Sequence, residues 1–212
     1  MKATDVYDVI RDKKIITIIR GAEEGVIVRI AEALFAGGIG MLEVTCNTPG
    51  FASMIRALKE AMEGKMLIGA GTVVSVDLAK KALAAGAEYA IAPDVNTDVI
   101  TYCVENDVAV VPGAATATEV LTARRYGAKM VKIFPASALG ADYIRQLRGP
   151  IDDVEFVAVG GVTPANVHEF MKAGCVGIGI GSSVATKANI AAGNWAGISA
   201  AAKDFVDAVN GD

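Results

Sequence analysis

Short apolar runs rich in β-branched residues alternate with longer segments whose apolar residues repeat at helical spacing. The runs that we expect to be strands cover residues 15–19, 41–45, 66–70, 89–92, 108–111, 130–134, 156–159 and 176–180. The intervening segments place apolar residues on one helical face, as Ile27, Ile30 and Leu34 do. Regular alternation of strand and helix predicts βαβ units and therefore a parallel sheet.

The even spacing of these units predicts a closed α/β barrel of the (β/α)₈ TIM type, rather than an open doubly wound sheet. The charged segment at residues 1–14 has a helical pattern, so we expect a helix before the first strand. Glycines that precede expected strands are predicted to end helices in the left-handed conformation: Gly37, Gly86, Gly127 and Gly174. No linker interrupts the series, so residues 1–212 are expected to form a single barrel domain.

The composition of the chain argues against nucleic acid and membranes as partners. Hydrophobic residues make up 53% of the chain, and the net charge is −4. Basic residues occur as short pairs and form no stripe, so we expect no nucleic-acid partner. No apolar run is long enough for a membrane span, and we expect no membrane partner. Three widely spaced cysteines without a CxxC pair predict free thiols and a cytoplasmic location.

Two charged residues interrupt the expected strands. Lys132 lies in the run 130–134, and Glu43 lies in the run 41–45. Side chains alternate along a strand, and the immediate neighbours of both residues are apolar. We therefore expect Lys132 and Glu43 to point into the barrel while their neighbours pack on the helices. A charge in such an interior is costly unless it is paired or used.

Two interpretations of Lys132 and Glu43 remain open at this point. One is a buried structural ion pair, and the other is an amine nucleophile with a proton shuttle. An apolar pocket lowers the pKa of a lysine, and a neutral amine attacks a ketone to form an imine. The iminium withdraws electrons, so a neighbouring carbon–carbon bond can break while a carboxylate moves the protons.

The last two strand ends carry the pattern of a phosphate site. Gly160-Gly161 precedes an expected helix start at Thr163, and Gly181-Ser182 is expected to begin another helix. Barrels commonly hold phosphate at the loops after strands seven and eight, where backbone amides and a helix dipole favour an anion. We therefore expect a phosphorylated small molecule as the partner of this end of the barrel.

The sequence lacks the residues that metal sites, dinucleotide-binding sites and catalytic thiols need. His168 is the one histidine and is expected on a helix surface, and no cysteine cluster accompanies it. We expect no zinc site and no other metal. The motif at residues 69–71 lacks the third glycine of a dinucleotide fingerprint, so no cofactor is expected. Cys46 has no histidine beside it in sequence and is not expected to be a catalytic thiol.

Taken together in chain order, six strings resemble the KHG/KDPG aldolase family. They are LEVTCNTPG (42–50), IGAGTV (68–73), PGAATATE (112–119), VKIFPAS (131–137), GGVTPANV (160–167) and GIGSS (179–183). The resemblance implies a class I aldolase that is a homotrimer and uses no metal. It implies that Lys132 is the Schiff-base lysine and that Glu43 is the general acid and base. The substrate contacts that it implies are Thr72 for the carboxylate, Pro93 and Phe134 for the pocket lining, and Gly160, Gly161 and Ser182 for the phosphate.

Two positions differ from many gluconate-type members of that family. Asn47 stands where those members carry an arginine that holds the substrate carboxylate, and Arg20 at the end of the first strand can supply the cation instead. Val159 stands where a threonine often precedes the glycine pair. Several strings are similar to the related 2-keto-3-deoxy-6-phosphogalactonate aldolase, so the substrate's configuration at C4 stays open.

The leading hypothesis is cleavage of 2-keto-3-deoxy-6-phosphogluconate to pyruvate and D-glyceraldehyde 3-phosphate. Cleavage of 4-hydroxy-2-oxoglutarate to pyruvate and glyoxylate is expected beside it. The first alternative is the galactonate epimer as the main substrate. A phosphosugar isomerase or epimerase would use a carboxylate pair and would not need the interior lysine. A catalytically silent phosphate-binding barrel would need neither Lys132 nor Glu43.

Overall fold

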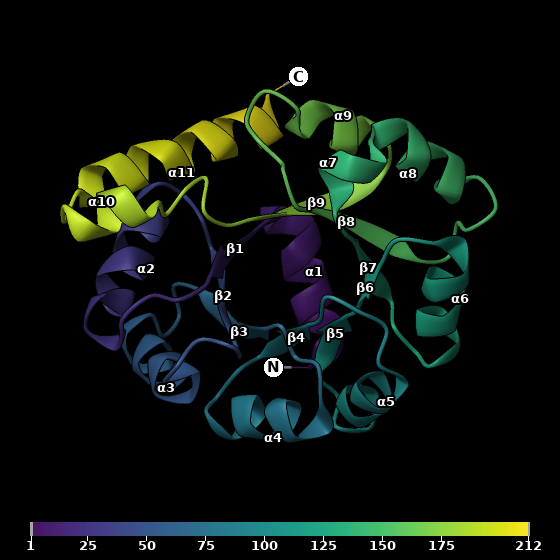
Figure 1. Cartoon of the computed structure of the whole chain (residues 1–212), viewed down its shortest axis with the longest axis horizontal. Coiled ribbons are helices and arrows are strands. Elements are labelled where there is room, and N and C mark those ends of the chain that lie inside the picture. The colour runs from purple at the N-terminus through teal and green to yellow at the C-terminus, as the bar shows by residue number, and fades with distance from the viewer. Residues whose placement is uncertain (1, 212) are drawn as a thin grey trace.

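The strands of the barrel form one parallel sheet. The computed structural model describes residues 2–211, and within them the strands follow the order β5-β4-β3-β2-β1-β9-β8-β7-β6 (Figure 1). Their bounds are β1 Ile15–Ile19, β2 Met41–Thr45, β3 Leu67–Gly71, β4 Tyr89–Ile91, β5 Ala109–Val111, β6 Gly113–Ala114, β7 Met130–Ile133, β8 Glu155–Val159 and β9 Cys175–Ile180. The eight predicted runs all become strand, which confirms the α/β barrel.

Apart from the first helix, which lies at the centre of the view, the helices surround the sheet as a ring (Figure 1). Their bounds are α1 Ala3–Lys13, α2 Ile27–Ala36, α3 Phe51–Ala61, α4 Val76–Ala84, α5 Thr97–Glu105, α6 Ala117–Arg125, α7 Ala136–Leu139, α8 Ala141–Arg148, α9 Val167–Lys172, α10 Lys187–Ala191 and α11 Trp195–Asn210, with a 3₁₀ turn, η1, at Glu24–Val26. The helices cover the outer face of the sheet, and the closed sheet encloses its own inner face, so the strand residues are almost all buried.

The fifth predicted strand is followed in the structure by a further short strand that was not predicted. Pro112 has no N–H to donate, and it separates β5, which pairs with β4, from β6, which pairs with β7. The two pieces are nearly continuous, since the N–H of Lys132 donates to the carbonyl of Pro112 at 2.8 Å. The segment therefore joins the two ends of the sheet and closes the barrel.

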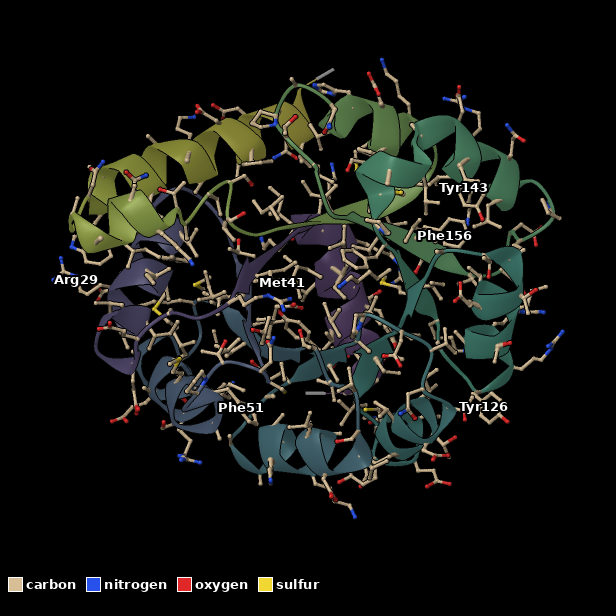
Figure 2. All side chains as sticks on the ribbon, in the orientation of Figure 1. Arg29, Met41, Phe51, Tyr126, Tyr143 and Phe156 are labelled. Carbon is tan, nitrogen blue, oxygen red and sulfur yellow. The ribbon has the colours of Figure 1, made fainter. Side chains whose placement is uncertain are left out.

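Side chains divide between two hydrophobic cores according to their strand parity. The outward-facing residues of the strands pack with the helices in the larger core, and Phe156 is the largest of them. The inward-facing residues form a smaller core inside the barrel, which includes Met41 and Tyr89. In Figure 2, Met41 lies within the barrel and Tyr126 at the outer surface, where it is 48% exposed.

The predicted N-terminal helix, α1, closes the end of the barrel where the strands begin. Its buried residues Val6, Tyr7 and Ile10 belong to the inner core. The Tyr7 hydroxyl donates to the carbonyl of Val110 at 3.2 Å and accepts from its N–H at 3.0 Å. Two hydrogen bonds of 2.8 Å from the Arg11 guanidinium to the Glu155 carboxylate hold α1 against the start of β8. Access to the inner core is therefore from the opposite end, where the strands finish.

The predicted helix ends are confirmed at three of the four glycines. Gly86, Gly127 and Gly174 have φ angles of 101°, 101° and 99°. The prediction for Gly37 is wrong, because its φ is −84° and Gly38 has φ 94° instead. A Cβ at Gly37 would lie 2.5 Å from Ala202 Cβ, so this glycine is required by close packing against α11.

The three cysteines are buried and free, as predicted. Among the helices of residues 2–211, none combines the length and apolarity needed to cross a membrane.

Candidate active site

Lys132 and Glu43 point into the barrel, as the strand alternation predicted. Glu43 lies on the inner face of β2 and is 1% exposed, and Lys132 lies on the inner face of β7 and is 7% exposed. Both line one small cavity of about 10 Å³, which is the size of a single water molecule. Apolar side chains and one glycine form the rest of its wall: Ile16, Ile18, Ile91, Val111, Val157, Val159 and Gly179.

Two glycines on the inner face of β3 make room for the polar groups. A Cβ at Gly71 would lie 2.2 Å from Glu43 Oε1, and a Cβ at Gly69 would lie 2.3 Å from Tyr89 Cε2. Neither approach is compatible with a larger residue. The string IGAGTV therefore has a steric role, because its two glycines form the floor on which the carboxyl of Glu43 and the ring of Tyr89 lie.

Burial shifts the ionisation of both interior groups towards their neutral forms. Burial raises the pKa of Glu43 to about 7, against the opposing attraction of Lys132 and Arg20. Burial lowers the pKa of Lys132, Glu43 opposes that shift, and Arg20 adds to it. The pair thus supplies an amine that gives up its proton more readily than usual and a carboxyl that exchanges a proton near neutral pH. Those are the properties of a nucleophile and a general acid–base.

Arg20 and Thr72 meet at the mouth of the barrel. The Arg20 guanidinium donates to Thr72 Oγ1 at 3.4 Å. Thr72 has φ 55°, an unusual angle for a β-branched residue, and it follows Gly71 directly. The adjoining loop is held because the N–H of Gly21 donates to Thr48 Oγ1 at 3.0 Å. The predicted carboxylate-binding pair is therefore assembled beside Glu43.

Phe134 closes the other side of the mouth. Its ring is 38% exposed, and its centroid lies 4.6 Å from Lys132 Nζ. A Cβ at Gly160 would lie 3.2 Å from the Phe134 ring, and Gly160 has φ 96°. Pro93 is half-buried after β4, and its carbonyl oxygen would lie 2.5 Å from a Cβ at Gly113. Of the predicted pocket lining, the Phe134 ring thus lies beside the end of the lysine side chain, and Pro93 packs against Gly113, which pairs with Lys132 in the sheet.

The glycine turn after β8 is held by two residues that the sequence did not reveal. Gly161 has φ 72°, and a Cβ there would lie 2.1 Å from Ser137 Oγ, so only glycine fits. Asn166 Nδ2 donates to the carbonyl of Gly161 at 3.0 Å, and Asn166 Oδ1 accepts from the N–H of Thr163 at 2.8 Å. The prediction that Thr163 caps the helix is wrong, since α9 begins after a turn and Asn166 is its N-cap residue.

Gly181 and Ser182 leave β9 beside that turn, because Val159 pairs with Gly179 in the sheet. The prediction that they begin a helix is wrong: residues 182–184 form a turn, and α10 begins at Lys187. Ser182 and Arg20 line a larger cavity of about 520 Å³ that excludes Lys132 and Glu43. The small cavity holds the ionisable pair, so we place the chemistry there despite the difference in size.

Cys46 and His168, which the sequence analysis also considered, lie where they have no catalytic role. Burial raises the pKa of Cys46 to about 12, so it is a neutral thiol at physiological pH. His168 is half-buried on α9, outside the barrel. Across residues 2–211, no three His, Cys, Asp or Glu side chains are grouped closely enough to hold a metal ion.

The chain is similar to known aldolases over most of its length. The model of the family "KDPG and KHG aldolase" matches residues 6–201. A 2-dehydro-3-deoxy-6-phosphogalactonate aldolase of Escherichia coli (strain K12) is 37% identical over 171 residues, which are 80% of this chain and 83% of that protein. A 2-dehydro-3-deoxy-phosphogluconate aldolase of Treponema pallidum (strain Nichols) is 36% identical over 183 residues, which are 86% of this chain and 87% of that one.

Solved structures give the same result. A KDPG aldolase from Legionella pneumophila, with pyruvate captured as a covalent carbinolamine intermediate, superimposes with a TM-score of 0.87 at 30% identity over 93% of this chain and 96% of that one. A native KDPGal structure gives a TM-score of 0.86 at 34% identity over 92% and 93% of the two chains. The chain thus belongs to the KDPG and KHG aldolase family and is an aldolase, a carbon–carbon lyase.

Proposed function

We propose that this aldolase cleaves a 2-keto-3-deoxy-6-phospho sugar acid to pyruvate and D-glyceraldehyde 3-phosphate through a Schiff base on Lys132. The observation that carries the proposal is the buried amine beside a buried carboxyl whose pKa is about 7, both in one apolar cavity. Pyruvate captured as a carbinolamine in the Legionella relative supports the same first adduct here.

The reaction follows from the two side chains. Neutral Lys132 Nζ attacks the C2 ketone, and the carbinolamine takes a proton from the Glu43 carboxyl and loses water to give a protonated imine. Glu43 takes the proton of the C4 hydroxyl as the C3–C4 bond breaks, and the aldehyde leaves. The bonding electrons pass into the enamine, and Glu43 returns the proton to C3. Hydrolysis of the protonated imine then releases pyruvate and the neutral amine, and the proton set free returns to the Glu43 carboxylate. Glu43 ends each cycle as it began, so no external acid, base or reductant is required.

The proposal is tested by trapping. Borohydride added with pyruvate reduces the imine, so mass spectrometry should locate one added pyruvate on Lys132. Lys132→Met keeps the apolar stem and should lose both the adduct and turnover. Lys203→Met removes an exposed lysine paired with Asp207 and should retain both. Turnover without an adduct at Lys132 would rule out the proposed mechanism.

We assign the two ends of the substrate to different groups of residues at the mouth. Arg20 and Thr72 bind the carboxylate, and the turns at Gly160-Gly161 and Gly181-Ser182 bind the phosphate. Arg20→Ala should therefore reduce cleavage of both the phosphorylated acid and 4-hydroxy-2-oxoglutarate. Ser182→Asp places like charge against the phosphate and should impair the phosphorylated substrate alone. The reverse pattern would show that the two ends are exchanged.

Two observations bear on the alternatives. The charged groups that shift the pKa of Glu43 are cations, which disfavours an isomerase built on a carboxylate pair. Val159 lines the catalytic cavity with methyl groups and offers no hydrogen bond to a C4 hydroxyl, which favours relaxed or galactonate preference. Both epimers yield the same products, because cleavage makes C4 the aldehyde carbon. Turnover must therefore be compared on each purified epimer separately.

We also propose a homotrimeric assembly. Support comes from a designed cage, built by fusing symmetric oligomeric domains, in which one region is 34% identical to this chain with a TM-score of 0.86. Light scattering coupled to gel filtration measures the mass and would contradict the proposal if it gave a monomer.

A further inference from the structure

Two buried polar atoms in the barrel interior have no hydrogen-bond partner. Across residues 2–211, three buried side-chain atoms lack a hydrogen-bond partner: Glu43 Oε2 and Tyr89 Oη in the interior, and Thr17 Oγ1 outside it. Thr17 lies on the face of β1 that packs towards the helices, with Ile15 and Ile19. Glu43 and Tyr89 face inwards from β2 and β4. An unpaired buried polar group is costly, so this coincidence calls for a common explanation.

The sheet brings these two side chains together. Strand β3 lies between β2 and β4, and Glu43 pairs with Gly69 in the register. The Tyr89 ring lies over Gly69, while the Glu43 carboxyl lies over Gly71, two residues along the same strand. Two strand residues span about 7 Å. Because both positions are glycine, no β3 side chain separates the phenol from the carboxyl.

We propose that Tyr89 is a positioning residue for Glu43, donating a hydrogen bond from its hydroxyl to Glu43 Oε2 through one buried water. A water between two polar groups that lie beyond direct hydrogen-bond distance satisfies both of them at little cost. The bond fixes the carboxyl while it exchanges protons with the substrate, and this role rests on the proposed function.

Among the groups that face the Glu43 carboxyl, the Tyr89 hydroxyl is the strong hydrogen-bond donor that carries no charge. Lys132 on β7 and Arg20 after β1 contribute positive charge, and Cys46 after β2 is a neutral thiol. Burial raises the pKa of Tyr89, so the phenol stays protonated and remains a donor at neutral pH. A hydrogen bond donated to a carboxylate favours its ionised form. Tyr89 therefore opposes part of the desolvation that raises the pKa of Glu43.

The test is the titration of Glu43 itself. Carbon-13 NMR of glutamate-labelled protein follows each carboxyl with pH, and Glu43→Gln assigns the signal. Tyr89→Phe should raise the pKa of Glu43 by about one unit, a tenfold change equivalent to about 1.4 kcal/mol. The acid limb of the kcat profile for cleavage should move to higher pH by the same amount. Substituting 3,5-difluorotyrosine at position 89 makes a stronger donor and should shift the pKa downwards.

Tyr7→Phe is the matched control. Tyr7 is also a buried interior tyrosine, but its hydroxyl is bound to the backbone of Val110. This variant should lower the melting temperature and leave the Glu43 titration in place. An unchanged or lower pKa in Tyr89→Phe would overturn the proposal, as would a difluorotyrosine variant without a downward shift. The NMR signal does not depend on turnover, so it decides the question even if the phosphorylated acids prove not to be substrates.

Discussion

Replacing Glu43 with glutamine should reduce catalysis and, above neutral pH, stabilise the fold. Glutamine has nearly the same shape but cannot exchange a proton, so kcat should fall by roughly 10²–10⁴-fold. The gain in stability arises because the folded protein must bury an ionised carboxyl at high pH. Glu43 is 1% exposed, and burial raises its pKa from the ordinary 4.5 to about 7.

The magnitude follows from that shift. Below pH 4.5 the carboxyl is protonated in both the folded and unfolded chains and contributes no difference. Between 4.5 and about 7 the unfolded chain ionises first, so the stability of the wild type falls as pH rises. Above that range the loss is complete, and at 1.36 kcal/mol per unit it amounts to about 3 kcal/mol. Glu43→Gln lacks this titration.

Urea unfolding of both proteins at equal concentration measures the effect. The stability of Glu43→Gln relative to the wild type should grow by about 2–3 kcal/mol between about pH 5 and pH 8. Packing changes caused by the substitution do not vary with pH and cancel in this comparison. Glu63→Gln alters an exposed carboxylate in the turn after α3 and should change stability by less than about 0.5 kcal/mol at each pH. A relative stability of Glu43→Gln that stays constant across the range would refute the reasoning.

Two further substitutions test the shape of the site. Gly71→Ala places a methyl group 2.2 Å from Glu43 Oε1, so the carboxyl must move away by about 1 Å and kcat should fall about 100-fold. The control is Gly40→Ala, whose methyl group meets its nearest atom at 3.5 Å and should leave activity unchanged. Near-normal turnover of Gly71→Ala would mean that the position of this oxygen is not critical. Val159→Thr adds a hydrogen-bonding group to the catalytic cavity and should shift the kcat/KM ratio towards the gluconate epimer by about 5- to 150-fold. An unchanged ratio would show that selectivity at C4 arises elsewhere in the pocket.

The barrel and its ionisable pair could be predicted from the sequence because both depend on strand alternation. A period of two places every second residue on the same face, so one lysine and one glutamate among apolar neighbours are sufficient to predict their direction. The same rule placed the apolar neighbours of Lys132 and Glu43 on the helix side, and the outer core contains them.

Most of what the sequence did not reveal depends on how segments approach one another in space. Ser137 contacts Gly161 because β7 and β8 are adjacent in the sheet. Asn166 lies five residues after Gly161 in the same loop, and its hydrogen bond to the Gly161 carbonyl depends on the path of that loop. In the sequence, Tyr89 is only an aromatic residue at the start of an expected strand. The role that we propose for it depends on Gly69 of β3, over which its ring lies. The helix starts at Thr163 and Gly181 were misplaced because capping residues and glycines also occur in the turns that precede helices.

The break between β5 and β6 at Pro112 has a consequence for self-association. The N–H and C=O of Val110 point away from β4 and would form a free strand edge, but the Tyr7 hydroxyl binds both of them. Such an edge is a template on which two chains can join strand to strand. Helix α1 therefore covers this open position of the sheet as well as filling the barrel. A chain in which α1 has not docked leaves both groups of Val110 without this partner, so we expect it to associate with other chains more readily than the closed barrel does.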